Sequence, residues 1–130
     1  NRRDIPRAGE KITERLDQGE GVIVFPEGTS TKGDEVLPFN SSFLEFAARS
    51  NIPVSYAAIS FRTPPGEPPA SETICWWEDI GFFPHLWRLM KLPGYAAIIH
   101  FGESPIVNPN RKELASELRR RVLENFTPII

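Results

Sequence analysis

The sequence predicts an α/β fold with a mostly parallel central sheet flanked by helices. Two observations lead to this class: amphipathic helical stripes alternate with short apolar runs, and these runs are continuous instead of alternating with polar residues. Continuous apolar runs are typical of strands that are covered on both faces, as in parallel sheets. Elements in this order build layered α/β domains, whose ligands bind beyond the carboxyl ends of the strands.

Three helices are predicted from their stripes and caps. Residues 6–17 and 110–125 each carry one apolar stripe, and the second of these segments opens with Asn110 as a candidate cap. Residues 42–49 open with a capping-box pattern that starts at Ser42, in which serine and glutamate side chains bind free backbone N–H groups. The stripes consist of Ala8, Ile12 and Leu16 in the first helix and Leu114, Leu118 and Val122 in the last.

A fourth helix is predicted at residues 82–92, FFPHLWRLMKL. Its polar residues His85, Arg88 and Lys91 lie on one face, and apolar side chains fill the rest. This pattern fits either a helix packed on a core with one wet stripe or a basic amphipathic helix on a bilayer surface. Residues 119–121, three arginines, are expected to be the solvated face of the last helix more than a patch for anionic lipid.

Four apolar runs predict strands. They are bounded by glycine and proline, and prolines between residues 64 and 69 mark an irregular loop. Adjacent strand residues face opposite sides, so at most one of Trp76 and Trp77 is expected in the core, and the other lines a groove. The predicted strands cover residues 21–25, 54–61, 73–77 and 95–101.

Composition restricts the classes of function. At 130 residues the chain is at most one domain, and its net charge of −2 argues against nucleic-acid binding. Cys75 is the single cysteine, expected to be a small buried hydrophobic residue, so the sequence predicts no disulfide framework. With only His85 and His100 as histidines, no metal site is expected. The sequence has no apolar stretch of the roughly 18 residues that suggest a membrane span.

One motif, FPEGTSTKGD at residues 25–34, combines features of a binding loop. Pro26 fixes one backbone angle and Gly28 tolerates positive φ, so the turn between them can hold Glu27 in one direction. The hydroxyls and Lys32 that follow could bind an anion. From the residues alone, Glu27 is either part of a site or an acid that faces water.

The motif and its continuation resemble the glycerophospholipid acyltransferase family, the 1-acyl-sn-glycerol-3-phosphate acyltransferase-like proteins. FPEGT is followed by LPF at residues 37–39 and IPV at residues 52–54, in the order that the family shows. Residues 1–4, NRRD, resemble the tail of the family's arginine-containing motif. The resemblance covers about residues 1–61 and implies a glycerol-3-phosphate acyltransferase-like fold.

The resemblance also implies a catalytic dyad, His-x4-Asp, in which the histidine is the general base. Neither histidine of this chain fits, because Met90 stands five positions after His85 and Pro105 five positions after His100. We therefore expect residues 1–130 to be the C-terminal portion of a single, N-terminally incomplete acyltransferase domain, with the dyad upstream of Asn1. On this expectation, none of the 130 residues is assigned as a catalytic residue.

The residues expected to bind substrate lie on the acceptor side of the reaction. Glu27, Gly28 and Thr29 match the family's acceptor loop, and Arg2, or Arg3 if the register shifts by one, matches an arginine that holds phosphate. Lys32 is expected to compensate in part for one departure from the family pattern. This departure is Ser30, which stands where the family has an arginine, and it puts the identity of the acceptor in doubt.

The implied activity is O-acyl transfer in phospholipid biosynthesis. The donor would be acyl-CoA or acyl-carrier protein, and the first expected acceptor is a lysophospholipid, 1-acyl-glycerol-3-phosphate. The resemblance implies no metal and no bound prosthetic group. It places the protein on the cytoplasmic side of a membrane, either peripheral or anchored through segments outside these residues.

A second class of function stays open, a catalytically silent lipid-binding or scaffolding module. A His-x4-Asp motif encoded upstream of Asn1 would favour the enzyme. A natural start codon close to Asn1 would favour the module.

Overall fold

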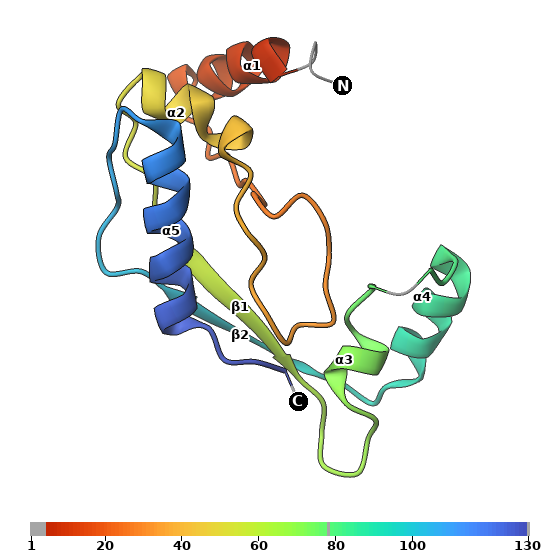
Figure 1. The fold of residues 1–130 in the computed structure, drawn as a ribbon. Helices are drawn as coiled ribbons and strands as arrows, with labels where there is room; N and C mark the ends of the chain where they lie inside the picture. Colours follow the sequence, from red (N-terminus) through yellow and green to blue (C-terminus); the bar gives the residue numbers. More distant parts are fainter. Residues whose placement is uncertain (1–4, 78, 130) are drawn as a thin grey trace.

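The computed structural model describes residues 5–77 and 79–129, and side chains from residue 9 onward. Figure 1 shows α5 lying along the sheet of β1 and β2, with α1 and α2 at one end and α3 and α4 at the other. The elements are α1 (Ile5–Asp17), η1 (Ser41–Leu44), α2 (Glu45–Arg49), β1 (Ala57–Arg62), α3 (Ala70–Thr73), α4 (Phe82–Lys91), β2 (Ala96–Phe101) and α5 (Arg111–Asn125).

All four predicted helices are present. The cap of α5 is confirmed, since the Asn110 side chain accepts hydrogen bonds from the N–H groups of Lys112 and Glu113. The capping-box prediction at Ser42 is wrong. Asn40 caps this helical segment instead, and its side chain accepts from the Ser42 N–H at 3.0 Å, so the helix starts one residue earlier as the 3-10 turn η1.

The sheet of the described residues differs from the mostly parallel central sheet that the sequence predicts. β1 and β2 are antiparallel and form a two-stranded sheet, in register from Ala57 opposite Phe101 to Arg62 opposite Ala96. Parallel neighbours need a crossover that packs back on the sheet. The connection between β1 and β2 instead turns away, and α3 and α4 lie beyond the end of the strands (Figure 1).

Two of the four predicted strands are wrong. Residues 21–25 form no strand: Ile23 and Phe25 are 83% and 71% exposed, and none of the described segments forms a ladder with them. Residues 73–77 also form no strand, because the backbone there is used in helical hydrogen bonds. The N–H groups of Ile74 and Cys75 both donate to the Ala70 carbonyl, at 2.9 and 3.0 Å.

The core forms where α5 packs on the sheet and on the short helices. The predicted stripe of α5 is confirmed, and Leu114 is fully buried with 0% exposure. Ala58 is buried on one face of β1. On the opposite face, Ile59 and its cross-strand partner Ile99 are 40% and 48% exposed. The two core clusters contain Leu44, Ala47, Ala48, Leu114, Ala115 and Leu118 in one and Val36, Ala58 and Val122 in the other.

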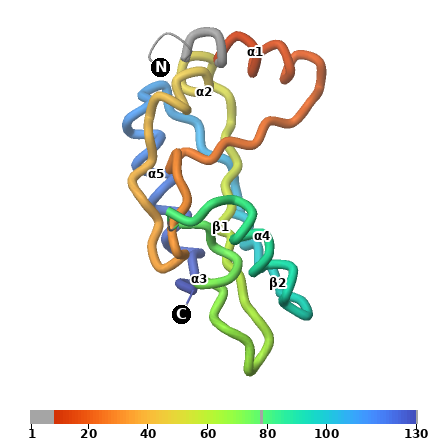
Figure 2. Tube along the Cα trace, turned by 90° about the vertical axis from the view of Figure 1, so that its right-hand side faces the viewer, coloured from red at the N-terminus to blue at the C-terminus, as the bar shows by residue number. Residues whose placement is uncertain are grey.

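Figure 2 shows the long connection between α1 and η1, which runs along the side of the molecule past β1 and α5. This connection contains the FPEGT motif and is anchored at its far end by Val36, which is buried in the core with Val122. Among the described residues, no helix is long and apolar enough to span a bilayer.

Candidate functional site

The FPEGT motif forms a closed loop. The Gly28 N–H donates to the Phe25 carbonyl at 3.2 Å, and the Asn40 N–H donates to the Pro26 carbonyl at 2.8 Å. Gly28 has a φ of 73°, a left-handed conformation that favours glycine. The loop therefore leaves and rejoins the molecule at adjacent points, and its geometry depends on Gly28 as predicted from the sequence.

Glu27 lies half-buried at the mouth of this loop. Its Oε2 accepts a hydrogen bond from the Leu37 N–H at 2.7 Å, which links residues ten positions apart. Oε1 receives no hydrogen bond from any residue within the described ranges. A carboxylate accepts through both oxygens, so one oxygen holds the loop while the other can accept a hydrogen bond from a ligand.

The residues after Glu27 differ in how they are held. Thr29 is exposed, whereas the Ser30 hydroxyl donates to the Trp76 carbonyl. Lys32 lies over the Trp77 ring, with 5.9 Å from Nζ to the ring centroid, and pairs with Asp34 at 3.0 Å. The loop is thereby joined to the segment that carries the two tryptophans, and the charge of Lys32 already has a partner.

Of the predicted site residues, Glu27, Gly28, Thr29 and Lys32 lie in this single loop. Arg2 lies outside the residues that the structure describes, so its phosphate-binding role stays a prediction. Neither His85 nor His100 is followed by an aspartate at the fifth position. In the described part of the chain, no group of three potential ligands among His, Cys, Asp and Glu is placed to hold a metal ion.

Arg119 is a residue at this site that sequence reasoning missed. Its Nη2 donates to the Val36 carbonyl at 2.7 Å and its Nε to the Leu37 carbonyl at 3.0 Å. The expectation of a solvated arginine face holds for its neighbours but is wrong for Arg119. The stripe could have revealed this, because Arg119 lies four residues after Ala115 and three before Val122, both of which are buried.

The two neighbouring arginines bind acids on the surface of α5. Arg120 and Arg121 both contact Glu117, at 2.6 and 3.0 Å, and also pair with Glu124. The hydrogen bonds from Arg120 and Arg121 lower the pKa of Glu117 to about 2. These ion pairs lie at the surface, so they add little to the stability of the fold.

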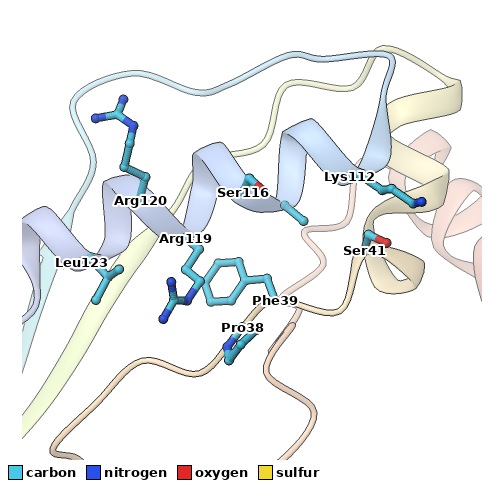
Figure 3. Close-up of a pocket in the computed structure, with 9 residues that line it drawn as sticks. Pro38, Phe39, Ser41, Lys112, Ser116, Arg119, Arg120 and Leu123 are labelled. Carbon is cyan, nitrogen blue, oxygen red and sulfur yellow. The ribbon is translucent and has the colours of Figure 1, made fainter.

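A hollow of about 520 Å³ lies between α5 and the segment after the motif loop (Figure 3). The Arg119 and Phe39 side chains lie next to each other at this hollow, with Pro38 close by. Glu27 does not line it, so the hollow adjoins the motif loop without containing its carboxylate. Its lining residues are Pro38, Phe39, Ser41, Lys112, Ala115, Ser116, Arg119, Arg120 and Leu123.

Neither tryptophan of the pair occupies the core. Trp76 and Trp77 are 44% and 45% exposed, which agrees with the expectation that at most one of them lies in the core, although the segment that carries them is not a strand. Trp76 stacks on His85 of α4 with ring centroids 5.6 Å apart, and its Nε1 donates to the Ile80 carbonyl at 2.8 Å. The neighbouring Cys75 is half-buried, not fully buried as expected from the sequence, and this partial burial raises the pKa of its thiol.

Comparison with known proteins gives the family of the chain. The family model described as Acyltransferase matches residues 1–60, the part that contains the motif loop. A lyso-ornithine lipid O-acyltransferase of Rhizobium meliloti is 32% identical over 124 residues, which cover 85% of this chain and 42% of the relative. Another of the same name, from Rhodobacter capsulatus, is 29% identical over 81% of this chain and 40% of its own length.

A 1-acyl-sn-glycerol-3-phosphate acyltransferase of Neisseria gonorrhoeae is 27% identical over 71% of this chain and 35% of the relative. The chain thus spans less than half the length of these relatives. No solved structure matches the chain. The family match covers the FPEGT loop, and the relatives align well beyond it, so the chain belongs to the glycerophospholipid acyltransferase family.

Proposed function

We propose that this protein transfers a fatty acyl group from a thioester donor to the hydroxyl of a lysolipid. The observation that carries the proposal is the Glu27 carboxylate, which is fixed through Oε2 by the Leu37 N–H at 2.7 Å. Its second oxygen can accept a hydrogen bond from the acceptor hydroxyl and orient the oxygen lone pair toward the thioester carbonyl. The names of the relatives support acyl transfer to a lysolipid.

In the proposed reaction the acceptor oxygen forms an ester bond to the acyl carbon, and the carbon–sulfur bond of the donor breaks. The hydroxyl proton passes to a general base, and the leaving thiolate is protonated to a thiol. The donor is acyl-CoA or acyl-carrier protein, and the reaction uses no further cofactor. The residues of this chain serve the acceptor side, and Glu27 acts by orientation instead of proton abstraction.

The charge of the motif loop bears on which lysolipid is the acceptor. Residues 26–37 carry three carboxylates and one lysine, and that lysine, Lys32, pairs with Asp34 at 3.0 Å. Ser30 supplies no cation where the family has an arginine, and its hydroxyl donates to the Trp76 carbonyl. An anionic loop without a free cation disfavours a phosphate and suits a head group that carries an amine.

Two acceptors follow from the names of the relatives, and the loop charge ranks them. We place a lyso-ornithine lipid first, because ornithine carries an amine, and the expected 1-acyl-glycerol-3-phosphate second. The second acceptor would depend on Arg2 for its phosphate. Purified full-length protein should therefore acylate both lysolipids, with the higher kcat/KM for the lyso-ornithine lipid. If neither lysolipid is acylated, with acyl-CoA or with acyl-carrier protein as the donor, the proposed function is contradicted.

Replacing Ser30 by arginine should change this preference. The guanidinium can bind a phosphate through two hydrogen bonds, so Ser30→Arg is expected to raise kcat/KM for 1-acyl-glycerol-3-phosphate, relative to that for the lyso-ornithine lipid, by about tenfold. Competition assays with both lysolipids measure the ratio. Ser30→Ala is the matched control: it loses the hydrogen bond to the Trp76 carbonyl without adding charge, and should leave the ratio unchanged. An unaltered ratio in Ser30→Arg would show that position 30 does not select the head group.

We further propose that α4 contacts the membrane that holds the acceptor. None of its described residues is buried, and four large apolar side chains are 53% to 79% exposed. Lys91 lies over the Trp87 ring at 5.6 Å, which combines a cation and an aromatic ring on one helix. Aromatic and basic residues together favour an anionic lipid interface. Because acyl-CoA and acyl-carrier protein are cytoplasmic, we assign this surface to the cytoplasmic side. The four apolar residues are Phe82, Phe83, Trp87 and Met90.

Acidic substitutions on α4 test the membrane contact. The double variant Phe83→Glu, Trp87→Glu should lower partitioning of the full-length protein onto anionic phospholipid vesicles at least tenfold, because it removes apolar burial and adds repulsion. Co-sedimentation with vesicles measures this. The control is Val107→Glu, which adds one carboxylate at a 50% exposed apolar residue of the segment between β2 and α5, and it should leave partitioning unchanged. Equal partitioning of wild type and double variant would exclude α4 as the contact.

A further inference from the structure

One peptide group is held from both sides by charged side chains. The peptide between Val36 and Leu37 accepts a hydrogen bond at its carbonyl from Arg119 Nη2, at 2.7 Å. The N–H of the same peptide donates to Glu27 Oε2, also at 2.7 Å. A cation of α5 and the carboxylate of the FPEGT loop are therefore connected through a single planar group.

The Val36–Leu37 peptide is held firmly against α5. Arg119 also donates from Nε to the Leu37 carbonyl at 3.0 Å, so its planar guanidinium binds two successive carbonyls. Val36 is 4% exposed and packs with Ala58 and Val122, which fixes the same segment in the core. The segment that carries the Leu37 N–H therefore cannot shift without breaking contacts to α5.

We propose that Arg119 is a positioning residue for Glu27 and acts through the Val36–Leu37 peptide. The guanidinium polarises this peptide and strengthens its N–H as a donor to the carboxylate. It thereby fixes the direction of Oε1, the oxygen that is left for the acceptor hydroxyl. This inference rests on the proposed function of Glu27 and assigns the last helix of the chain a part in it.

The neighbouring arginines supply the matched control. Arg121 belongs to the same helix and the same run of three arginines, but it pairs with Glu117 and Glu124 at the surface. Loss of Arg121 removes the same charge without affecting the Val36–Leu37 peptide. Arg120 lines the hollow and is therefore less suitable as a control.

The test compares Arg119→Ala, Arg119→Lys and Arg121→Ala in the full-length protein. Arg119→Ala is expected to lower kcat about tenfold and to leave the KM for the acyl donor unchanged, because only acceptor orientation is lost. Lysine keeps the positive charge but cannot bind both carbonyls in one plane. Arg119→Lys should therefore recover only part of the rate that Arg119→Ala loses. Arg121→Ala should have the wild-type rate. Amide hydrogen exchange of Leu37 should become faster in Arg119→Ala and not in Arg121→Ala.

A double-mutant cycle with Glu27→Gln separates this inference from the function on which it rests. If Arg119 acts through Glu27, adding Arg119→Ala to Glu27→Gln should lower kcat less than twofold further. Additive losses would overturn the inference and show that Arg119 acts independently, for example on a substrate in the adjoining hollow. If Arg119→Ala is fully active while Glu27→Gln has a low acyl-transfer rate, the inference about Arg119 is overturned and the proposed role of Glu27 stands. Full activity of Glu27→Gln would overturn the proposed role of Glu27, whereas absence of acyl transfer by the wild-type protein would overturn the proposed function. Should Arg119→Ala fail to fold, Arg119→Lys and its Leu37 exchange rate decide.

Discussion

Replacing Glu27 by glutamine is expected to lower acyl transfer about 100-fold while the protein stays folded. A hydrogen bond to a charged group contributes about 1.5–3 kcal/mol, and the upper part of this range corresponds to two orders of magnitude in rate. The glutamine side chain keeps one carbonyl oxygen, which can still accept from the Leu37 N–H that binds Oε2 at 2.7 Å. The acceptor hydroxyl then meets a neutral amide in place of a carboxylate oxygen.

The measurement combines an acyl-transfer assay with thermal unfolding of both proteins. Glu35→Gln is the matched control, because Glu35 is an exposed acid of the same loop. It should leave both the rate and the melting temperature unchanged. If Glu27→Gln retains the wild-type rate, Glu27 does not orient the acceptor, and the acceptor binds elsewhere.

Replacing Leu114 by alanine should have the largest effect on stability. Leu114 is 0% exposed in the first turn of α5 and packs with Leu44, Ala47 and Ala48. Removing a fully buried leucine side chain costs the lost burial plus the cavity that remains, about 2–5 kcal/mol of the free energy of unfolding. That is a large share of the stability of a typical domain.

Urea denaturation measures this loss as a lower midpoint at an unchanged slope. Leu123→Ala makes the same chemical change on the same helix, at a side chain that is 41% exposed, and should cost less than about 1 kcal/mol. Equal losses for the two variants would contradict the assignment of Leu114 to the core. A smaller Leu114→Ala effect with a changed slope would point to a change in the denatured state.

The helices could be predicted because their signals are local. The stripe of α5 and its Asn110 cap lie within a few residues of each other, and both are confirmed. The strands depend on pairing partners distant in the sequence, which periodicity does not reveal. Residues 21–25 show this, since a β-branched run without a ladder among the described residues leaves Ile23 83% exposed.

The candidate site divides in the same way. The turn around Glu27 and Gly28 could be predicted, because the Pro-Glu-Gly sequence itself encodes it, and Gly28 has the positive φ that this turn needs. Arg119 could not be assigned from the motif, since it binds Leu37 from 82 residues away. The partners of Lys32 and Ser30 could not be predicted from the sequence either, because the contacts to Asp34 and Trp76 depend on how the loop folds over its neighbours.

The contact between Arg119 and the Leu37 carbonyl also bears on the order in which the protein matures during its synthesis. The loop leaves the ribosome 82 residues before the arginine that fastens it. At about 5–20 residues per second, the nascent loop waits for several seconds without this fastening. During this interval the loop lacks its contact with Arg119, so the Leu37 segment that holds Glu27 is fixed to α5 only after Arg119 has been made.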